Sequence, residues 1–201
     1  MSKPLAHLVD DDAAMRDALA WLLRSRAIES RAWDCAEAFL ADYQDTMRGC
    51  LVLDIRMRDM TGLELFDHLL ARGCALPVIF LTGHGEVPLA VKSLKKGAFD
   101  FLEKPFDDNE LADRVIEALG RDAENRARGQ ITDQVQKRLA NLTQREREVM
   151  NAILAGKMNK VIADELNIAM RTVEVHRAHV FEKMAVRSAV ELTQLLSRLP
   201  R

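Results

Sequence analysis

The chain has 201 residues, enough for two ordinary domains or one large one. Hydrophobic residues make up 48% and charged residues 30%, a composition that excludes global disorder. No apolar run approaches the roughly 20 residues that a membrane-spanning helix needs, and the first residues do not resemble a secretory signal. The three cysteines form no paired motif, which favours reduced thiols over a disulfide or zinc framework. We therefore expect a cytoplasmic protein with no membrane contact.

Charge is unevenly distributed along the chain. Residues 1–120 carry 14 Lys and Arg against 21 Asp and Glu, a net charge of −7. Residues 121–201 carry 15 against 10, a net charge of +5, and together the two parts give the −2 of the whole chain. A basic second part would attract a polyanion such as nucleic acid, although the same surplus is also compatible with an ordinary solvated surface.

The first 106 residues alternate short apolar runs with amphipathic stretches. Continuous apolar runs are typical of strands buried on both faces of a parallel sheet, with helices as the connections. The sequence therefore predicts an α/β fold with a doubly wound, five-stranded parallel sheet. The expected strands cover residues 5–9, 29–33, 50–54, 77–81 and 98–102. The expected helices cover residues 15–23, 35–43, 62–72 and 86–96, and a fifth begins near residue 107.

Polar residues follow these predicted strands at their carboxyl ends. Residues 10–12 are three aspartates directly after the first strand, and Asp54 ends the third. Thr82 follows the fourth strand, and Lys104 lies two residues past the fifth. Ligands of open α/β sheets bind beyond the carboxyl ends of the strands, so we expect a site at this edge.

The residue types at this edge indicate phosphoryl chemistry. Carboxylates that meet at one point suit Mg²⁺, which keeps several waters and accepts one or two carboxylates together with a phosphoryl oxygen. One carboxylate could attack a phosphoryl group, while a hydroxyl and an ammonium would hold the transferred oxygens. The simpler alternative for each residue alone is that it caps a helix or ends a strand.

Residues 121–140 differ in composition from what precedes them. They are polar and charged, and they contain helix formers apart from the glycines. Ile131, Val135, Leu139 and Leu142 recur at helical spacing, and Gly129 is the expected break. The sequence thus predicts a charged linker over 121–140 between domains at 1–120 and 141–201, and leaves open whether this linker is stiff or loose.

The remaining residues predict an all-α domain. Thr143 and Glu146 form a capping box that opens a helix, and Gly156 ends it. A short helix that ends at Asn167 follows, then one over 170–184 and one over 188–199. Four helices with a tight junction between the second and the third indicate a helix-turn-helix domain.

Several segments resemble the receiver domain of two-component response regulators, over about residues 4–120. The segments are Leu8-Val9-Asp10-Asp11-Asp12, Leu53-Asp54-Ile55-Arg56-Met57, Leu81-Thr82-Gly83 and Glu103-Lys104-Pro105-Phe106. The string from Leu81 to Ala90 is similar to the FixJ subgroup in particular. The resemblance implies control of transcription by phosphorylation.

The resemblance assigns roles to the residues of the sheet edge. Asp54 would be the phosphoacceptor, and Asp12 would stay outside the first metal shell. The expected ligands of Mg²⁺ are Asp10, Asp11, Asp54 and the backbone carbonyl of Arg56. Lys104 would pair with the phosphoryl group, and the Lys104–Pro105 bond is expected to be cis. The family's usual proline after the phosphoacceptor is replaced by Arg58, which we expect to alter loop stiffness modestly.

Phosphorylation would act as a switch in this scheme. A phosphoryl group adds roughly two negative charges and three strong acceptors, so Thr82 could turn inward and bond to it. Phe101 could then fill the vacated space, although by itself it is also an ordinary core aromatic. The face built by the fourth helix and the fifth strand would then change shape. On this helix, the expected contacts in a phosphorylation-dependent homodimer are Val87, Val91 and Lys95.

The basic part resembles a LuxR-type helix-turn-helix, as in the FixJ and NarL regulators. The matching segments lie within residues 142–150, 156–163 and 171–184. On the helix over 170–184, residues that face a major groove could read base edges, and others could contact phosphates. The expected base contacts are Arg171, Glu174 and Val175. The expected phosphate contacts are Lys160, Thr172, Arg177 and Lys183.

One position departs from the LuxR-type pattern. Ala169 stands where the family commonly has a Ser that caps the recognition helix. Losing a side-chain cap costs on the order of 1 kcal/mol, so we expect a slightly frayed start to this helix.

The sequence thus predicts a transcriptional regulator and not an enzyme. Its expected partners are a sensor histidine kinase, double-stranded promoter DNA and RNA polymerase. Two alternatives remain at this point. The first is a phosphatase or phosphotransferase that uses Asp54, but Arg56 occupies the position where a second acid–base carboxylate would stand. The second is an interaction protein whose basic module binds protein or RNA.

Overall fold

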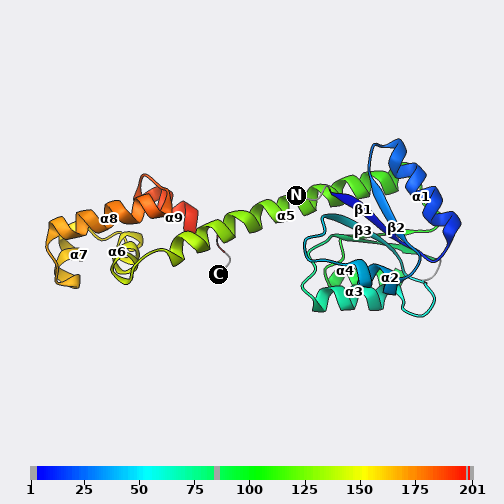
Figure 1. Cartoon of the computed structure of the whole chain (residues 1–201), viewed down its shortest axis with the longest axis horizontal. Helices are drawn as coiled ribbons and strands as arrows, with labels where there is room; N and C mark the ends of the chain where they lie inside the picture. Colours follow the sequence, from blue (N-terminus) through cyan, green and yellow to red (C-terminus); the bar gives the residue numbers. More distant parts are fainter. Residues whose placement is uncertain (1–3, 84–86, 198, 200–201) are drawn as a thin grey trace. The chain divides into compact units, whose positions relative to one another are not determined.

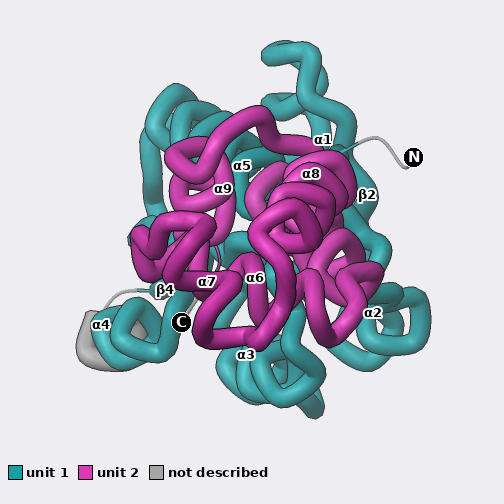
Figure 2. The backbone as a smooth tube through the Cα atoms, turned by 90° about the vertical axis from the view of Figure 1, so that its left-hand side faces the viewer, with its two compact units in different colours: residues 1–126 teal, residues 127–201 magenta. Residues whose placement is uncertain are grey.

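The computed structural model describes residues 4–83, 87–197 and 199, without the side chains of residues 87–90. The chain forms two compact units, residues 1–126 and 127–201 (Figure 2). Within the described residues, no helix is both long enough and apolar enough to cross a membrane.

The first unit contains a five-stranded sheet in the order β2-β1-β3-β4-β5. Every neighbouring pair of strands is parallel, which confirms the predicted doubly wound sheet. The strands are β1 (Leu5–Val9), β2 (Ser30–Trp33), β3 (Gly49–Asp54), β4 (Val78–Thr82) and β5 (Asp100–Glu103). The helices are α1 (Ala13–Ser25), α2 (Ala36–Asp42), α3 (Gly62–Ala71), α4 (Val87–Lys95) and α5 (Asp108–Ala140).

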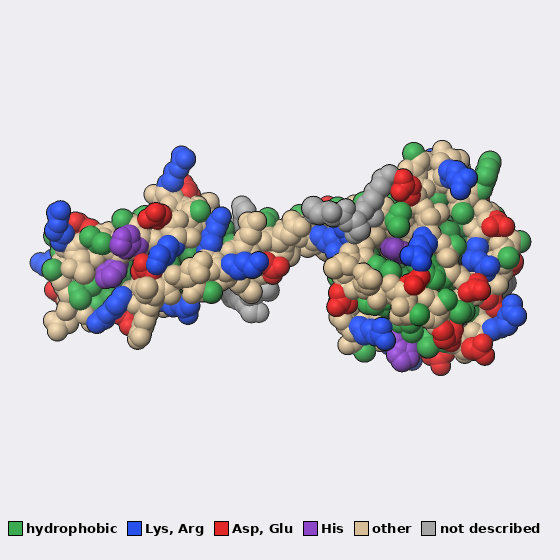
Figure 3. Space-filling view, viewed as in Figure 1, with side chains coloured by type: hydrophobic (Ala, Val, Ile, Leu, Met, Phe, Trp, Pro, Cys, Tyr) green, Lys and Arg blue, Asp and Glu red, His purple; other side chains and the backbone are tan. Residues whose placement is uncertain are grey.

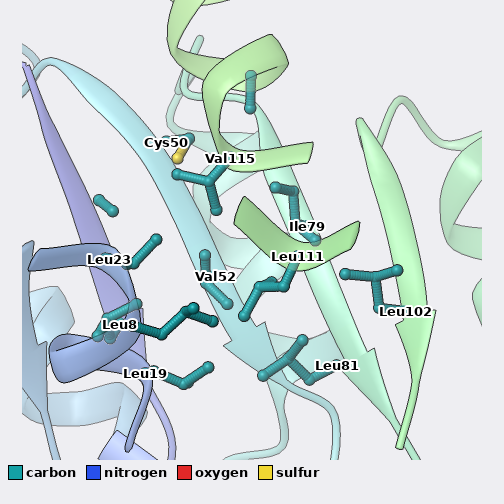
Figure 4. Packing of buried hydrophobic residues seen from close by; sticks show 13 residues of the cluster. Leu8, Leu19, Leu23, Cys50, Val52, Ile79, Leu81, Leu102, Leu111 and Val115 are labelled. Carbon is teal, nitrogen blue, oxygen red and sulfur yellow. The ribbon is translucent and has the colours of Figure 1, made fainter. Parts of the chain in front are cut away.

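Helices cover both faces of this sheet. Helix α1 and the first turns of α5 lie on one face, and α2, α3 and α4 lie on the other (Figure 1). The first face packs Leu8 and Val52 of the strands against Leu23 of α1 and Leu111 and Val115 of α5 (Figure 4). Burying each such side chain contributes roughly 1.5–3 kcal/mol, so the two apolar faces hold the strands in place.

Three strands, β2, β4 and β5, begin later than predicted, and for β4 and β5 the reason is local. Pro77 has no N–H to donate, and β4 starts at Val78. Ala98 donates its N–H to the carbonyl of Ser93, so it belongs to the turn that ends α4, and Gly97 adopts a positive φ there. Strand β5 therefore starts at Asp100.

The register of the strands brings their carboxyl ends to one edge. Val9 pairs with Leu53, and Leu53 in turn pairs with Phe80. Thr82 pairs with Glu103, so β4 and β5 end level with each other and Lys104 lies one position beyond. The polar residues that follow β1 and β5 and those that end β3 and β4 therefore lie at one edge, as predicted.

The second unit is a small helical domain. Its helices are α6 (Gln144–Leu154), α7 (Asn159–Leu166), α8 (Met170–Met184) and α9 (Ala189–Leu196). Thr143 and Glu146 form the predicted capping box, and Gly156 and Asn167 adopt the left-handed conformation just after α6 and α7. The buried core is Val135, Leu142, Val149, Met150, Ala152, Ile153, Ile162, Ala163, Val173, Val180, Met184 and Leu192.

Helix α5 carries the chain from one unit into the other. It runs without interruption through Gly129, so the predicted break at this residue is wrong. A single glycine costs a helix about 1 kcal/mol relative to alanine, and the good helix formers on both sides outweigh this cost. The division at residues 120 and 140 stays a prediction.

Candidate functional site

Three carboxylates converge at the carboxyl edge of the sheet. Asp10 and Asp11 follow β1, and Asp54 is the last residue of the neighbouring strand β3. One oxygen of each lies within 4.8 Å of the others. Asp10 and Asp54 are buried and Asp11 is half-buried, so the cluster opens to solvent on the side of Asp11.

Lys104 places a cation over two of these carboxylates. Its Nζ lies 2.6 Å from Oδ1 of Asp54 and 3.1 Å from Oδ2 of Asp10. The backbone N–H of Lys104 donates to the carbonyl of Thr82 at 2.7 Å, which places the lysine after β5. The Lys104–Pro105 bond is cis, as expected.

The electrostatic environment of Asp54 disfavours its negative charge. Burial raises the pKa of Asp54 above its ordinary value, and the nearby charge of Asp10 raises it further. Hydrogen bonds from Lys104 and from the backbone of Arg56 lower this pKa but do not offset the burial. A bound cation would reverse this balance, because positive charge stabilises the carboxylate form that can attack phosphorus.

Lys104 stays charged in this setting. Burial lowers its pKa, but the hydrogen bond and charge of Asp54, together with those of Asp10, outweigh burial and raise the pKa overall. The site therefore presents a permanent ammonium beside Asp54.

The donor set fits Mg²⁺. The three clustered carboxylates supply hard oxygen ligands, which this ion prefers. Asp12 has a different task, since its side chain accepts the N–H of Ala14 at 2.9 Å and caps α1. Its backbone N–H donates to Oδ1 of Asp10 at 2.8 Å and orients that carboxylate.

Thr82 is on β4, the strand beside β3, and Phe101 is on β5, the next strand in the sheet. Thr82 is fully buried, and its Oγ1 has no hydrogen-bond partner among the described residues. An unpaired buried hydroxyl costs about 1–3 kcal/mol, a cost that a new acceptor would relieve. Phe101 is half-buried against the core on the α3 side.

The sequence did not indicate a role for Gly62, and it did not indicate the partner of Arg58. A Cβ on Gly62 would lie 2.1 Å from the backbone oxygen of Asp54, so only glycine lets α3 start this close to the end of β3. Arg58 donates both its backbone N–H and its Nε to Oδ2 of Asp11, each at 3.2 Å. Proline at this position could make neither bond.

Helix α8 of the second unit has one buried and one exposed face. Val173, Val180 and Met184 are buried, and His176 is half-buried on the same stripe. The opposite face is exposed and carries Arg171, Glu174, Val175 and Ala178. Ala169 gives no side-chain cap to this helix, as its sequence indicates. Lys and Arg side chains are spread over the visible face of this unit (Figure 3).

Two of the predicted phosphate contacts have internal partners. Nζ of Lys183 lies 2.6 Å from Oε2 of Glu146, whose side chain is buried. The guanidinium of Arg177 lies over the ring of Phe181, 5.5 Å from its centroid. Lys160 and Thr172 are exposed.

The expected dimer contacts lie on α4. Val91 and Lys95 are both exposed, and Val91 is 41% exposed. The side chain of Val87 lies outside the described residues.

Family comparisons cover both units. Residues 6–116 match the response regulator receiver domain, and residues 140–196 match the bacterial regulatory proteins of the luxR family. Both matches agree with the two resemblances seen in the sequence.

Two relatives match over nearly all of this chain and of their own length. The chain is 49% identical to the C4-dicarboxylate transport transcriptional regulatory protein DctR of Rhodobacter capsulatus, with 94% of this chain and 97% of DctR covered. It is 47% identical to the transcriptional regulatory protein FixJ of Azorhizobium caulinodans, with 94% and 90% covered.

Solved structures lead to the same family. The response regulator StyR matches with a TM-score of 0.90 at 41% identity over 98% of this chain and all of StyR. Full-length FixJ from B. japonicum matches with a TM-score of 0.62 at 41% identity over 98% of both chains. The chain therefore belongs to the two-component response regulators that join a receiver domain to a LuxR-type DNA-binding domain and act on transcription.

Proposed function

We propose that a sensor histidine kinase phosphorylates Asp54 and that this modification controls DNA binding by the second unit. The observation that carries the proposal is the position of Lys104, whose Nζ bridges Asp54 and Asp10 at the open edge of the sheet. A structural ion pair would not need a third carboxylate within 4.8 Å that opens to solvent. A nucleophile, a metal ligand set and a cation for the transferred oxygens are thus gathered at one point.

In this reaction an oxygen of Asp54 attacks the phosphorus of a phosphohistidine, the P–N bond breaks, and an acyl phosphate forms. Asp10, Asp11, Asp54 and the carbonyl of Arg56 would hold Mg²⁺, which supplies positive charge to the phosphoryl oxygens. Lys104 would exchange its bond with Asp54 for one with a phosphoryl oxygen. The unpaired Oγ1 of Thr82 would donate to another, because this hydroxyl has no competing partner to leave.

The shape change would spread from Thr82. Phe101 lies on the adjacent strand, where Phe80 pairs with it, and would move into space that Thr82 vacates. The exposed side chains of Val91 and Lys95 on α4 would then contact a second copy, and Val87 stays a predicted contact on the same helix. Pairing of two receivers raises the effective concentration of two DNA-binding units, which strengthens binding to a two-half-site operator.

The second unit would place α8 in the major groove. Arg171 could bond to a guanine, Glu174 could accept from a cytosine, and Val175 could contact a thymine methyl. All three are exposed on the face opposite the buried stripe. Lys160, Thr172, Arg177 and Lys183 would contact phosphates, the last two with the part of each side chain that its internal partner leaves free. Bound in this way, the regulator would contact RNA polymerase at a promoter.

Substitution of Asp54 tests the phosphoacceptor directly. We expect Asp54→Asn to abolish the incorporation of phosphoryl groups from acetyl phosphate in the full chain. Asp12→Asn is the matched control, because asparagine also caps helices well and Asp12 lies outside the metal ligands. Phosphorylation is measured by the mass of the intact protein, and undiminished labelling of Asp54→Asn would overturn the assignment.

DNA binding is tested with a family of duplexes at several salt concentrations. We expect Lys160→Ala and Arg177→Ala to weaken binding to all sequences and to reduce its salt dependence. Arg171→Ala should relax the preference at one base position instead. Identical behaviour of the three variants would contradict this division into phosphate contacts and base contacts. The luxR-family match favours this duplex-binding function over the alternative of a protein- or RNA-binding module.

A further inference from the structure

Each of the three clustered carboxylates has a cation supplied by the chain itself. Lys104 forms ion pairs with Asp10 and Asp54, and Arg58 forms an ion pair with Asp11. Both donors of Arg58, its backbone N–H and its Nε, reach the same oxygen of Asp11, Oδ2, at 3.2 Å. Asp11 is also the least buried of the three, so its side of the cluster is where an ion from solvent would enter.

The pair between Arg58 and Asp11 is easily broken. The side chain of Arg58 is 84% exposed, against 24% for Asp11. Exposed ion pairs contribute little, because water screens both charges and the long side chain loses rotamer freedom. The backbone N–H of Arg58 holds Asp11 independently of the guanidinium, so the carboxylate keeps its orientation when the side chain leaves.

The guanidinium has other partners close by. A hollow of about 280 Å³ lies beside Asp11, and Arg58 lines it together with Asp34 and Asp59. A displaced guanidinium could remain in this hollow near these two carboxylates. The second arginine of the hollow, Arg16, cannot play the same part, since its guanidinium donates to the backbone oxygen of Asp10 at 2.7 Å and not to a carboxylate.

We infer that Arg58 is a positioning residue that competes with Mg²⁺ for Asp11 and so weakens metal binding by the receiver. An ion that approached Asp11 would meet a positive charge within hydrogen-bond distance of one of its two oxygens. The ion must displace that charge or bind beside it, and both cost free energy. This inference rests on the proposed metal site and adds that its affinity is set from outside the ligand set.

The test measures metal affinity and not phosphorylation. The unphosphorylated full chain is titrated with MnCl₂ at constant ionic strength, with free Mn²⁺ measured by electron paramagnetic resonance, and bound Mn²⁺ is then displaced with MgCl₂. Mn²⁺ shares the preference of Mg²⁺ for carboxylate oxygens. Arg58→Gln keeps the backbone N–H and most of the length of the side chain but removes its charge.

We expect Arg58→Gln to tighten Mn²⁺ and Mg²⁺ binding about threefold to tenfold, the range that an exposed pair and its residual repulsion allow. Arg58→Lys keeps the charge and should stay within about twofold of the original chain by the same reasoning. Arg72→Gln is the charge-matched control. It lies at the other end of α3, roughly 15 Å along the helix, beyond the screening length of about 8 Å.

Three outcomes would overturn the inference. If Arg58→Gln bound the metals no more tightly than the original chain, Arg58 would not compete for Asp11. If Arg72→Gln tightened binding equally, the effect would be one of overall charge. If neither the original chain nor any variant bound Mn²⁺ saturably, the metal site of the proposed function would fail as well. Asp11→Asn removes the carboxylate that Arg58 holds. If this variant loses Mn²⁺ binding while Arg58→Gln tightens it, both the metal site and the role of Arg58 are supported.

Discussion

Each unit of this protein buries a carboxylate against a lysine, and the two pairs behave in opposite ways. The Nζ–O distance is 2.6 Å both in Lys104–Asp54 and in Lys183–Glu146. Glu146 also accepts the backbone N–H of Thr143 at 2.8 Å, and its pKa falls to about 2, chiefly through the hydrogen bond from Lys183. Asp54 instead has a raised pKa, since burial and Asp10 oppose its charge.

The difference separates a structural pair from a reactive one. The oxygens of Glu146 are satisfied by a capping box and a lysine, so its charge holds α6 against α8. The charge of Asp54 is under-compensated, which leaves a demand for positive charge that a metal ion meets. Perturbed carboxylates at the ends of sheet strands are thus better markers of chemistry than buried ion pairs as such.

The largest expected effect is the difference in stability caused by neutralising the carboxylate of each pair. We expect Glu146→Gln to destabilise residues 127–201 by about 2 kcal/mol, because charged hydrogen bonds are lost and Lys183 loses its partner. Asp54→Asn should change the stability of the first unit by less than about 1 kcal/mol, since it removes a charge that the fold disfavours.

Amide hydrogen exchange of the full chain measures both effects separately, with the amides of α6 and α8 for the first variant and those of β3 and β4 for the second. Equal destabilisation by the two variants would break the comparison.

The pH dependence of Glu146 is the next effect in size. Its pKa is lower in the folded chain, about 2, than its ordinary value of 4.5. Its stabilising contribution is therefore complete above about pH 5 and is lost as the pH falls toward 2. The difference in unfolding free energy between the original chain and Glu146→Gln, from urea titrations at several pH values, should shrink over this window. A difference that stays constant from pH 6 to pH 3 would contradict the assignment.

The smallest expected effect concerns the start of α8. The side chain of Thr143 caps the start of α6, but Ala169, which precedes α8, provides no side-chain cap. We expect Ala169→Ser to stabilise the start of α8 by about 1 kcal/mol and to strengthen DNA binding slightly. Thermal unfolding and duplex affinity are the measurements. If neither changes, a missing cap does not limit this helix.

Sequence reasoning located the site but not all of its contacts. Asp10, Asp54, Thr82 and Lys104 could be predicted because each ends or follows a strand, and parallel strands bring their carboxyl ends to one edge. The partner of Asp11 could not be predicted, because Arg58 lies 47 residues away along the chain and its hydrogen bond depends on the conformation of a loop. Proximity of this kind leaves no periodic pattern in a sequence.

The predicted linker gives a second example. Asp122 reads as one of many charges in a polar stretch, yet its side chain is buried and accepts the N–H of Gly49 at 3.0 Å. Arg126 donates to Asp122 and to the carbonyl of Met47. These contacts attach this part of α5 to the start of β3. Amphipathic periodicity does not report them, because a paired carboxylate can replace an apolar side chain in a buried position.

The order of strands and helices along the chain, the capping box of α6 and the edge of the sheet that carries the chemistry followed from the sequence alone. They depend on hydrophobic spacing and on side chains that bond to nearby backbone, which are local properties of the chain. The pairing of Arg58 with Asp11, the approach of Gly62 to Asp54 and the opposite charge environments of Asp54 and Glu146 were decided only by the tertiary structure. Burial and distance between remote segments set these properties, and neither exists until the chain has folded.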